Sequence, residues 1–430
     1  MSVFKRAGPA AVHPVVATHT PGRRRWLVVA LLFAAMLVNY VDRGNLSIVA
    51  LPVMRESGIS PAVMGTLLSA FFWTYAFLQV PAGYLVDRFG LKWTYAGAFL
   101  LWSAASAVTS LARSFQQILG LQALLGVGES VAPSASLAYI RQNFAEDQQG
   151  LPTAIYVSGM TLGSAVSALL GACVVVHLGW RALFVLTGLG SLVWLLPWLM
   201  LAPAAPSRPA IRASSSTCAF PPWRMLLTRP TFWGITIAAF LYSYYSYFCL
   251  TWLPSYLVMA RGYSFLRMGA YTAVPYLGTV LVSFSSARAA DRLITRVGHP
   301  MSVRKMFVVT GFVLGSAILL LLVLQSSLAV LFTLIFSLLG IGLASSNYWA
   351  LTEAISPGPV VGRVIGYQNM IASLGGICAP MLTGFLVGRT KSFELSIAFA
   401  GGALLVSAGA FLVLLRELDV KVLAARFPEN

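Results

Sequence analysis

The chain has 430 residues, of which 58% are hydrophobic and only 10% are charged. Soluble proteins average roughly a quarter charged residues, so this composition excludes an ordinary soluble domain and predicts a polytopic membrane protein. The net charge of +17 could suggest a nucleic-acid partner. The basic residues fall mainly in alternate loops, however, which is the pattern of membrane topology, and we expect no nucleic-acid binding.

Apolar stretches of spanning length recur along the whole chain and predict an all-α fold with twelve transmembrane helices. They cover residues 26–50, 61–85, 93–112, 115–140, 152–176, 180–201, 231–258, 266–287, 305–324, 328–352, 362–388 and 395–416. With both termini in the cytoplasm, 21 of the 29 Lys and Arg residues lie on that side, seven lie outside and Arg43 lies in the membrane. The positive-inside rule therefore predicts that both termini are cytoplasmic, and we expect a multi-pass protein of the cell membrane, in a bacterium the inner membrane.

The first predicted helix carries adjacent opposite charges, Asp42 and Arg43, within an apolar run. A charge in hydrocarbon costs at least about 2.5 kcal/mol and usually faces a polar cavity that marks a substrate or ion path. Tyr40, Arg43 and Ser47 share one face, while Asp42 lies about 100° round the helix. We expect Arg43 to point at a bound anion and Asp42 to face another partner. The alternative is a buried ion pair that only fixes helix packing.

Glu129 lies about half way through the fourth predicted helix and is the only other acid deep in the membrane. A carboxyl group whose surroundings alternate between desolvation and a nearby arginine can take up and release a proton. Asp42 and Glu129 are therefore the two candidates for proton coupling. The alternative is a structural glutamate that is satisfied by neighbouring hydroxyls such as that of Ser134.

Uncharged polar side chains gather in the predicted helices seven, ten and eleven. Hydroxyls, rings and amides at membrane depth can hold a polar ligand, although some of these side chains would only join helices or form an interfacial aromatic belt. With Tyr40 and Arg43, we expect the following residues to line a substrate site: Tyr244, Tyr247, Asn347, Trp349, Asn369 and Ser373.

The segment GYLVDRFGLKW, from Gly83 to Trp93, resembles the signature loop between helices two and three of the major facilitator superfamily. The resemblance implies two six-helix bundles with a central binding site. An internal repeat is in keeping with it, because Asp291 and Arg292 end helix eight as Asp87 and Arg88 end helix two, 204 residues earlier. Parallel repeats of this kind build such transporters. We expect these four residues to act in gating, with ordinary loop solvation as the alternative.

This organisation divides the chain into five parts. Residues 1–22 lack periodicity and are predicted to form a disordered cytoplasmic tail. Residues 23–201 form the first bundle, and the Pro-, Ser- and Arg-rich residues 202–229 form a cytoplasmic linker. Residues 230–417 form the second bundle, and residues 418–430 form a cytoplasmic tail.

Four segments in both halves resemble a narrower group, the anion:cation symporter family: NYVDRGNLS, LLGVGES, YFCLTWLPSYL and GGICAPMLTG. That family moves organic anions, including sugar acids, with or driven by cations. The resemblance implies that Arg43 binds a substrate carboxylate, that Asp42 is protonatable and that Glu129 takes part in coupling. The chain departs from the family at Gln122, where relatives carry an arginine. It also has Ser373 where sugar-acid permeases often have an amide.

The predicted function is proton-coupled symport of a small organic anion, a sugar acid or related carboxylate, by alternating access. A proton-driven exporter of drugs or metabolites and a non-transporting membrane receptor are the alternatives. Histidines and cysteines are dispersed, so we expect neither a disulfide framework nor a metal site. No nucleophile–base pair is visible, so we expect no enzyme and no cofactor. The expected partners are the anion, protons and the lipid bilayer, with the chain as a monomer.

Overall fold

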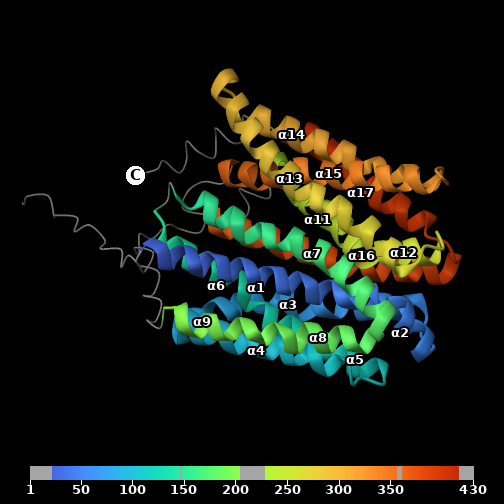
Figure 1. Cartoon of the computed structure of the whole chain (residues 1–430). Helices are drawn as coiled ribbons and strands as arrows, with labels where there is room; N and C mark the ends of the chain where they lie inside the picture. The colour runs from blue at the N-terminus through green and yellow to red at the C-terminus, as the bar shows by residue number, and fades with distance from the viewer. Residues whose placement is uncertain (1–21, 146–147, 204–227, 356–360, 416–430) are drawn as a thin grey trace, which may run out of the picture.

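The computed structural model describes residues 22–145, 148–203, 228–355 and 361–415, and these ranges are helical apart from short turns (Figure 1). The predicted tails and most of the predicted linker lie outside the described residues. All twelve predicted apolar segments coincide with helices in the structure. The all-α prediction is therefore confirmed for the described residues.

The first half of the chain contains helices α1 to α9, several of them consecutive pieces of one membrane pass. Their bounds are α1 Gly22–Ile48, α2 Ala50–Ser57, α3 Pro61–Phe89, α4 Leu91–Thr109, α5 Phe115–Glu129, α6 Val131–Asn143, α7 Gly150–Leu178, α8 Trp180–Ser191 and α9 Leu195–Leu201. A short 3-10 helix, Leu192–Trp194, joins α8 to α9.

The second half repeats this pattern with helices α11 to α17. Their bounds are α11 Pro230–Thr251, α12 Leu253–Met259, α13 Phe265–Val297, α14 Pro300–Gly315, α15 Ser327–Ile355, α16 Val361–Thr390 and α17 Glu394–Leu414. A 3-10 helix, Ser316–Leu322, extends α14.

Among the described residues, nine helical segments are long and apolar enough to cross a membrane. The other three predicted passes are α4, α11 and α13, which are also long but less apolar. Ser and Thr lower the hydropathy of α4, a run of tyrosines lowers that of α11, and arginines lower that of α13. Side chains of this kind in a membrane helix usually face a protein interior, an interface or a loop surface rather than lipid.

Turn residues separate these helices at predictable places. The Ser60 side chain accepts a hydrogen bond from the backbone N–H of Val63 and so caps α3, with Pro61 in the first turn. Ser114 and Ser264 cap α5 and α13 in the same way. Gly90 has a φ of 81°, which favours glycine and permits the abrupt turn from α3 into α4.

The two halves pack against each other mainly through α3 with α16 and α7 with α13, and to a smaller extent through α1 with α11 and α12 and through α2 with α12. Figure 1 shows the first half in blue and green below the second half in yellow and red. Close approach depends on glycine, since a Cβ on Gly65 would collide with the backbone of Pro380, and one on Gly269 would lie 2.6 Å from the carbonyl oxygen of Ala168. These contacts lie at the end that carries α2 and α12, opposite the start of α1.

Candidate functional site

A buried ion pair joins α1 to α5 in the middle of the first half. The Nε of Arg43 donates to Oε2 of Glu129 at 2.8 Å, and the two side chains are only 4% and 0% exposed. Asn39, one turn before Arg43, is also buried on α1. The spacing of these polar residues places a charged pair at membrane depth, where ions are costly unless they are paired.

Three aromatic rings surround the guanidinium of Arg43. Its Cζ lies 4.7 Å from the ring centroid of Tyr40, 4.5 Å from that of Phe71 and 4.4 Å from that of Tyr75. Tyr40 is one turn before Arg43 on α1, and Phe71 and Tyr75 are one turn apart on α3. Cation–π contacts of this kind hold an arginine in place without neutralising its charge.

The second half of the chain reaches this cluster through α11. The ring of Tyr247 packs edge-on against Phe72 of α3, with centroids 4.4 Å apart. The Tyr247 hydroxyl is also close enough to Arg43 and Tyr75 to interact with them electrostatically. Arg43 therefore lies near the boundary between the two halves, with its ion-pair partner in its own half and Tyr247 of the other half within electrostatic range.

Asp42 makes its contacts on a different side of α1 from Arg43. One carboxylate oxygen accepts hydrogen bonds from Ser106 Oγ on α4 at 2.8 Å and from Asn45 Nδ2 at 3.3 Å. Asn45 donates in turn to Thr187 Oγ1 on α8 at 2.8 Å. The carboxylate is 1% exposed and lies inside the first half, away from the boundary.

The two predicted site residues on α16, Asn369 and Ser373, lie along the same boundary between the halves, near the turn of α3 that follows Tyr75. Asn369 Nδ2 donates to Gln79 Oε1 on α3 at 2.6 Å, a hydrogen bond that connects the two halves. The hydroxyl of Ser373 donates to the carbonyl oxygen of Asn369 at 2.8 Å, within its own helix. Asn369 thus faces the first half, whereas the Ser373 hydroxyl is occupied locally.

The remaining predicted substrate residues lie within the second half. Tyr244 is buried on α11. The backbone there packs closely against α16, since a Cβ on Gly375 would lie 2.8 Å from the backbone nitrogen of Tyr244. Asn347 is fully buried and donates to the carbonyl oxygen of Leu343 one turn earlier at 3.2 Å. Trp349 is 36% exposed and its ring lies 5.4 Å from that of Tyr348. No contact joins these three to Arg43 among the described residues.

The four predicted gating residues lie near the ends of α3 and α13. Asp291 accepts from Arg304 on α14 at 3.0 Å, so its contact is within the second half. Asp87 and Arg88 are exposed, as is Arg292. The Cζ of Arg88 lies 5.4 Å from the ring centroid of Phe89. Their part in gating stays a prediction.

Comparison with known proteins identifies the family to which this architecture belongs. Residues 32–377, most of the chain, match the Major Facilitator Superfamily. The chain belongs to the Major Facilitator Superfamily. A crystal structure described as a bacterial homolog of the human lysosomal transporter Spinster superposes with a TM-score of 0.70 at 18% identity, covering 95% of this chain and 98% of that one. At that identity the superposition supports the fold alone.

Several transporters of sugar acids are similar in sequence over nearly their full length. The hexuronate transporter of Bacillus subtilis is 30% identical over 383 residues, which are 87% of this chain and 91% of the relative. The D-galactonate transporter of Escherichia coli O6:H1 is 26% identical over 423 residues, which are 93% and 97%. These relatives confirm the predicted resemblance to sugar-acid and organic-anion permeases. They also confirm that this member of the Major Facilitator Superfamily is a multi-pass membrane transporter rather than an enzyme.

In the described part of this Major Facilitator Superfamily member, no three His, Cys, Asp or Glu side chains come together as a metal site would require. Among the described cysteines, Cys173, Cys249 and Cys378 are unpaired thiols. Gln122, the departure from the family pattern, is buried on α5 two turns before Glu129.

Sequence reasoning missed the residues of α3 that complete the site. Phe71, Tyr75 and Gln79 follow each other at intervals of four and so form one stripe along a helix. That stripe faces Arg43 at its first two positions and Asn369 at its third. The i, i+4, i+8 spacing was readable in the sequence, but an aromatic stripe in a membrane helix usually indicates packing alone.

Proposed function

We propose that this Major Facilitator Superfamily transporter carries a small organic anion, with sugar acids as the first class to test, together with protons. The names of its relatives support the class of substrate, since transporters of hexuronate and D-galactonate align with nearly the whole chain. The observation that supports the mechanism is the buried ion pair between Arg43 and Glu129 at the boundary of the two halves.

A substrate carboxylate would compete with Glu129 for the guanidinium of Arg43. Once the substrate takes the guanidinium, the Glu129 carboxylate is left as a desolvated charge without its partner, which is strongly unfavourable. Uptake of a proton by Glu129 removes that charge. Binding of the anion and binding of a proton therefore favour each other, and this coupling is what symport requires.

Asp42 offers a second place for a proton within the same helix. Its hydrogen bond from Ser106 connects α1 to α4, and Asn45, which also donates to it, connects α1 to α8 through Thr187, whereas Arg43 lies toward the other half of the chain. A rotation of α1 that changes the Arg43 site would also change the contacts of Asp42. We therefore assign coupling to both carboxylates, with Glu129 responding directly to the substrate.

The hydroxyl groups of a sugar acid would be bound by uncharged donors and acceptors near Arg43. Tyr40 is adjacent to the guanidinium, Tyr247 packs against Phe72 of α3 nearby, and Asn369 lies at the same boundary on α16. Tyr244, Asn347, Trp349 and Ser373 remain predicted members of the site, to be brought to the substrate by movement of the second half.

We further propose that the described conformation is closed at the outer end of the boundary between the two halves. The glycine contacts of Gly65 and Gly269 close the end opposite the start of α1. With both termini in the cytoplasm, as the distribution of Lys and Arg predicts, the closed end is the outer one. The proposed setting is a monomer in the bacterial inner membrane, which alternates by rocking of the two halves.

The experiment is proton flux in proteoliposomes with a pH-sensitive dye and a panel of sugar acids, aromatic acids and short carboxylates. An anion-dependent proton movement in the wild type, lost in Arg43→Gln, is the expected result. Loss of one charge-assisted hydrogen bond weakens binding by about 10- to 100-fold. Arg389→Gln is the matched control, because Arg389 also lies over an aromatic ring, that of Phe385 at 5.5 Å, but far from the site. Full activity of Arg43→Gln, or anion uptake with no proton movement, would refute the proposal.

A further inference from the structure

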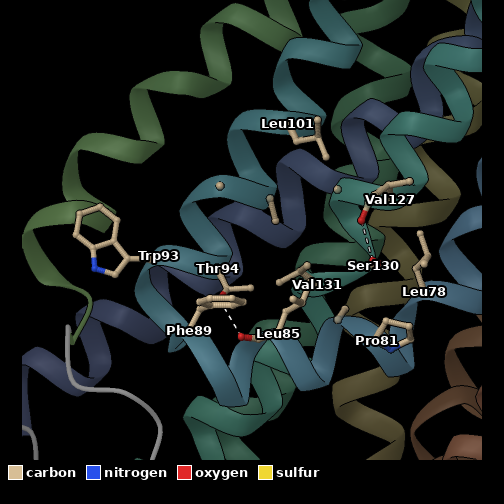
Figure 2. Close-up of a pocket in the computed structure, with 14 residues that line it drawn as sticks. Leu78, Pro81, Leu85, Phe89, Trp93, Thr94, Leu101, Val127, Ser130 and Val131 are labelled. Atoms are coloured by element: carbon tan, nitrogen blue, oxygen red, sulfur yellow. Dashed lines mark hydrogen bonds between the residues drawn. The ribbon is translucent and has the colours of Figure 1, made fainter.

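A long groove separates α3 from α4 on the side of the first half. It has a volume of about 490 Å³ and is lined almost wholly by apolar side chains from α3, α4, α5 and α6 (Figure 2). Leu78 and Leu85 lie along the α3 wall, Leu101 along the α4 wall, and Val127 and Val131 along the floor. None of the proposed substrate or coupling residues is among its lining residues.

The groove results from how the helices pack. Both α3 and α4 pack closely along α5, yet they touch each other only sparsely, so a space stays open between them. On the α4 wall Gly97 has no side chain to fill it, and a Cβ built on Gly97 would meet nothing within 4 Å. Gly128 on the floor is different, because a Cβ there would lie 2.9 Å from the Trp102 Cβ. Gly97 therefore keeps the groove open, whereas Gly128 allows close packing.

The length of the groove suits one leaflet of a bilayer. Its α4 wall runs from Trp93 to Leu101, nine residues whose eight successive rises extend about 12 Å in an α-helix. Half of a typical hydrocarbon core is roughly 15 Å thick. An acyl chain that enters from the end of α3 would therefore occupy the groove over most of a leaflet.

Cations and aromatic rings lie together at the mouth of the groove. Phe89 and Trp93, which line it, are 58% and 62% exposed. The Cζ of Arg88 lies 5.4 Å from the Phe89 ring, and the Nζ of Lys92 lies 5.6 Å from the Trp93 ring. Asp87 is also exposed here, so the mouth carries two cations and one acid. Aromatic rings and basic side chains at this depth favour a phospholipid headgroup with negative charge.

We propose that this groove is a binding site for one anionic phospholipid from the leaflet at the start of α4. One acyl chain fills the space beside Gly97, and the headgroup phosphate binds Arg88 and Lys92. Gly128, on the floor, is the neighbour of Glu129 in the chain, so the bound chain packs against the helix that carries the coupling carboxylate. The site is distinct from the substrate site and does not depend on the proposed transport function.

Native mass spectrometry of the delipidated full-length protein, titrated with phosphatidylglycerol or with phosphatidylcholine of the same chains, tests the site. We expect one phosphatidylglycerol to bind at least about tenfold more tightly than phosphatidylcholine, because the choline ammonium offsets the negative charge that Arg88 and Lys92 attract. Gly97→Leu should lose this lipid because leucine fills the groove. Gly190→Leu is the matched control, since a Cβ on Gly190 also meets nothing within 4 Å but lies on α8.

A second set of variants tests the contacts of Arg88 and Lys92 with the lipid headgroup. Arg88→Gln combined with Lys92→Gln should abolish the preference for phosphatidylglycerol, whereas Arg389→Gln should preserve it. A monodisperse elution profile and an unchanged thermal midpoint establish that each variant is folded. Equal affinity for the two lipids in the wild type, or wild-type phosphatidylglycerol binding by Gly97→Leu, would overturn the proposal. Selectivity that survives loss of both cations would overturn the assignment of the headgroup contacts.

Discussion

Arg43 and Glu129 are joined by a 2.8 Å hydrogen bond between α1 and α5, and both side chains are almost completely buried. A pair of this kind holds two opposite charges where neither is stable alone. Any anion that takes the place of Glu129 beside Arg43 must therefore be accompanied by a change at Glu129. The substitution Glu129→Gln, which removes the charge of the side chain but keeps its shape, therefore tests the role of Glu129.

We predict that Glu129→Gln separates exchange from accumulation. A glutamine keeps a carbonyl oxygen for Arg43 but cannot take up a proton in response to the substrate. Exchange of labelled for unlabelled anion across proteoliposomes should continue, whereas uptake driven by a pH gradient should fall to background. A variant that still concentrates the anion in a pH gradient would contradict the assigned role. Glu129→Asp, which keeps an acid, is the companion variant and should retain part of the gradient-driven uptake.

Asp42 provides a second prediction, in which stability and coupling respond differently. Asp42→Ala removes the carboxylate acceptor of Ser106 and one of the two acceptors of Asn45 in a buried site, which costs about 1–3 kcal/mol. Asp42→Asn keeps an oxygen for Ser106 and should stay close to wild-type stability while it changes proton-driven uptake. Thermal unfolding in detergent and dye-based proton flux measure the two effects. If Asp42→Ala and Asp42→Asn lower the thermal stability equally, the acceptor oxygen of residue 42 does not contribute to the stability of the fold.

The fold was predictable from the sequence because membrane helices are defined by length and hydropathy. The α3–α4 turn was also readable, since the sequence GYLVDRFGLKW contains the glycine that turns the chain at Gly90. Arg43 and Glu129 were predicted separately, as charges at membrane depth, but their pairing was not. Pairing depends on how α1 and α5 are rotated against each other, and hydropathy contains no such information.

The predicted substrate residues illustrate the same limit. Asn369 was expected near the substrate as an amide at depth, but its partner Gln79 was not anticipated, because the register of α16 against α3 is set by glycines far along both helices. Asn347 and Tyr244 were chosen by residue type and depth, and both lie buried within the second half. Residue type predicts which side chains can bind a polar ligand, whereas helix rotation decides which of them face the boundary.

The hydrogen bond between Gln79 and Asn369 provides a third prediction. Because it crosses the boundary between α3 and α16, Gln79→Ala and Asn369→Ala should each weaken the same interaction. In a double-mutant cycle their effects on the free energy of unfolding should be non-additive by about 0.5–1.5 kcal/mol. Strict additivity in thermal or denaturant unfolding would show that the two amides do not interact in the membrane protein as purified.

The end of α2 provides a prediction about pH, outside the membrane-spanning segments. Hydrogen bonds from Arg181 and from Trp180 Nε1 lower the pKa of Glu56 from its ordinary value of 4.5. The contact therefore stabilises the folded protein above pH 4.5, and this stabilisation is lost as the pH falls through the lowered pKa. The stability difference between wild type and Glu56→Gln should be at most about 1 kcal/mol at neutral pH, since both partners are half exposed. A difference that grows on acidification would contradict this sign.

Two glycines of α16 provide a matched test of closure at the end that carries α2 and α12. A Cβ on Gly384 would collide with the backbone of Pro61, whereas one on Gly388 would meet Ala62 at an ordinary 3.6 Å. Gly384→Ala should therefore disfavour closure of this end by about 1–3 kcal/mol, because backbone cannot move aside as a side chain can. Gly388→Ala should behave as the wild type. Distances between spin labels on α2 and α12 would report the closure, with a longer distance expected only for Gly384→Ala. If both variants keep the short distance and full uptake, close approach of α3 and α16 is not required for the transport cycle.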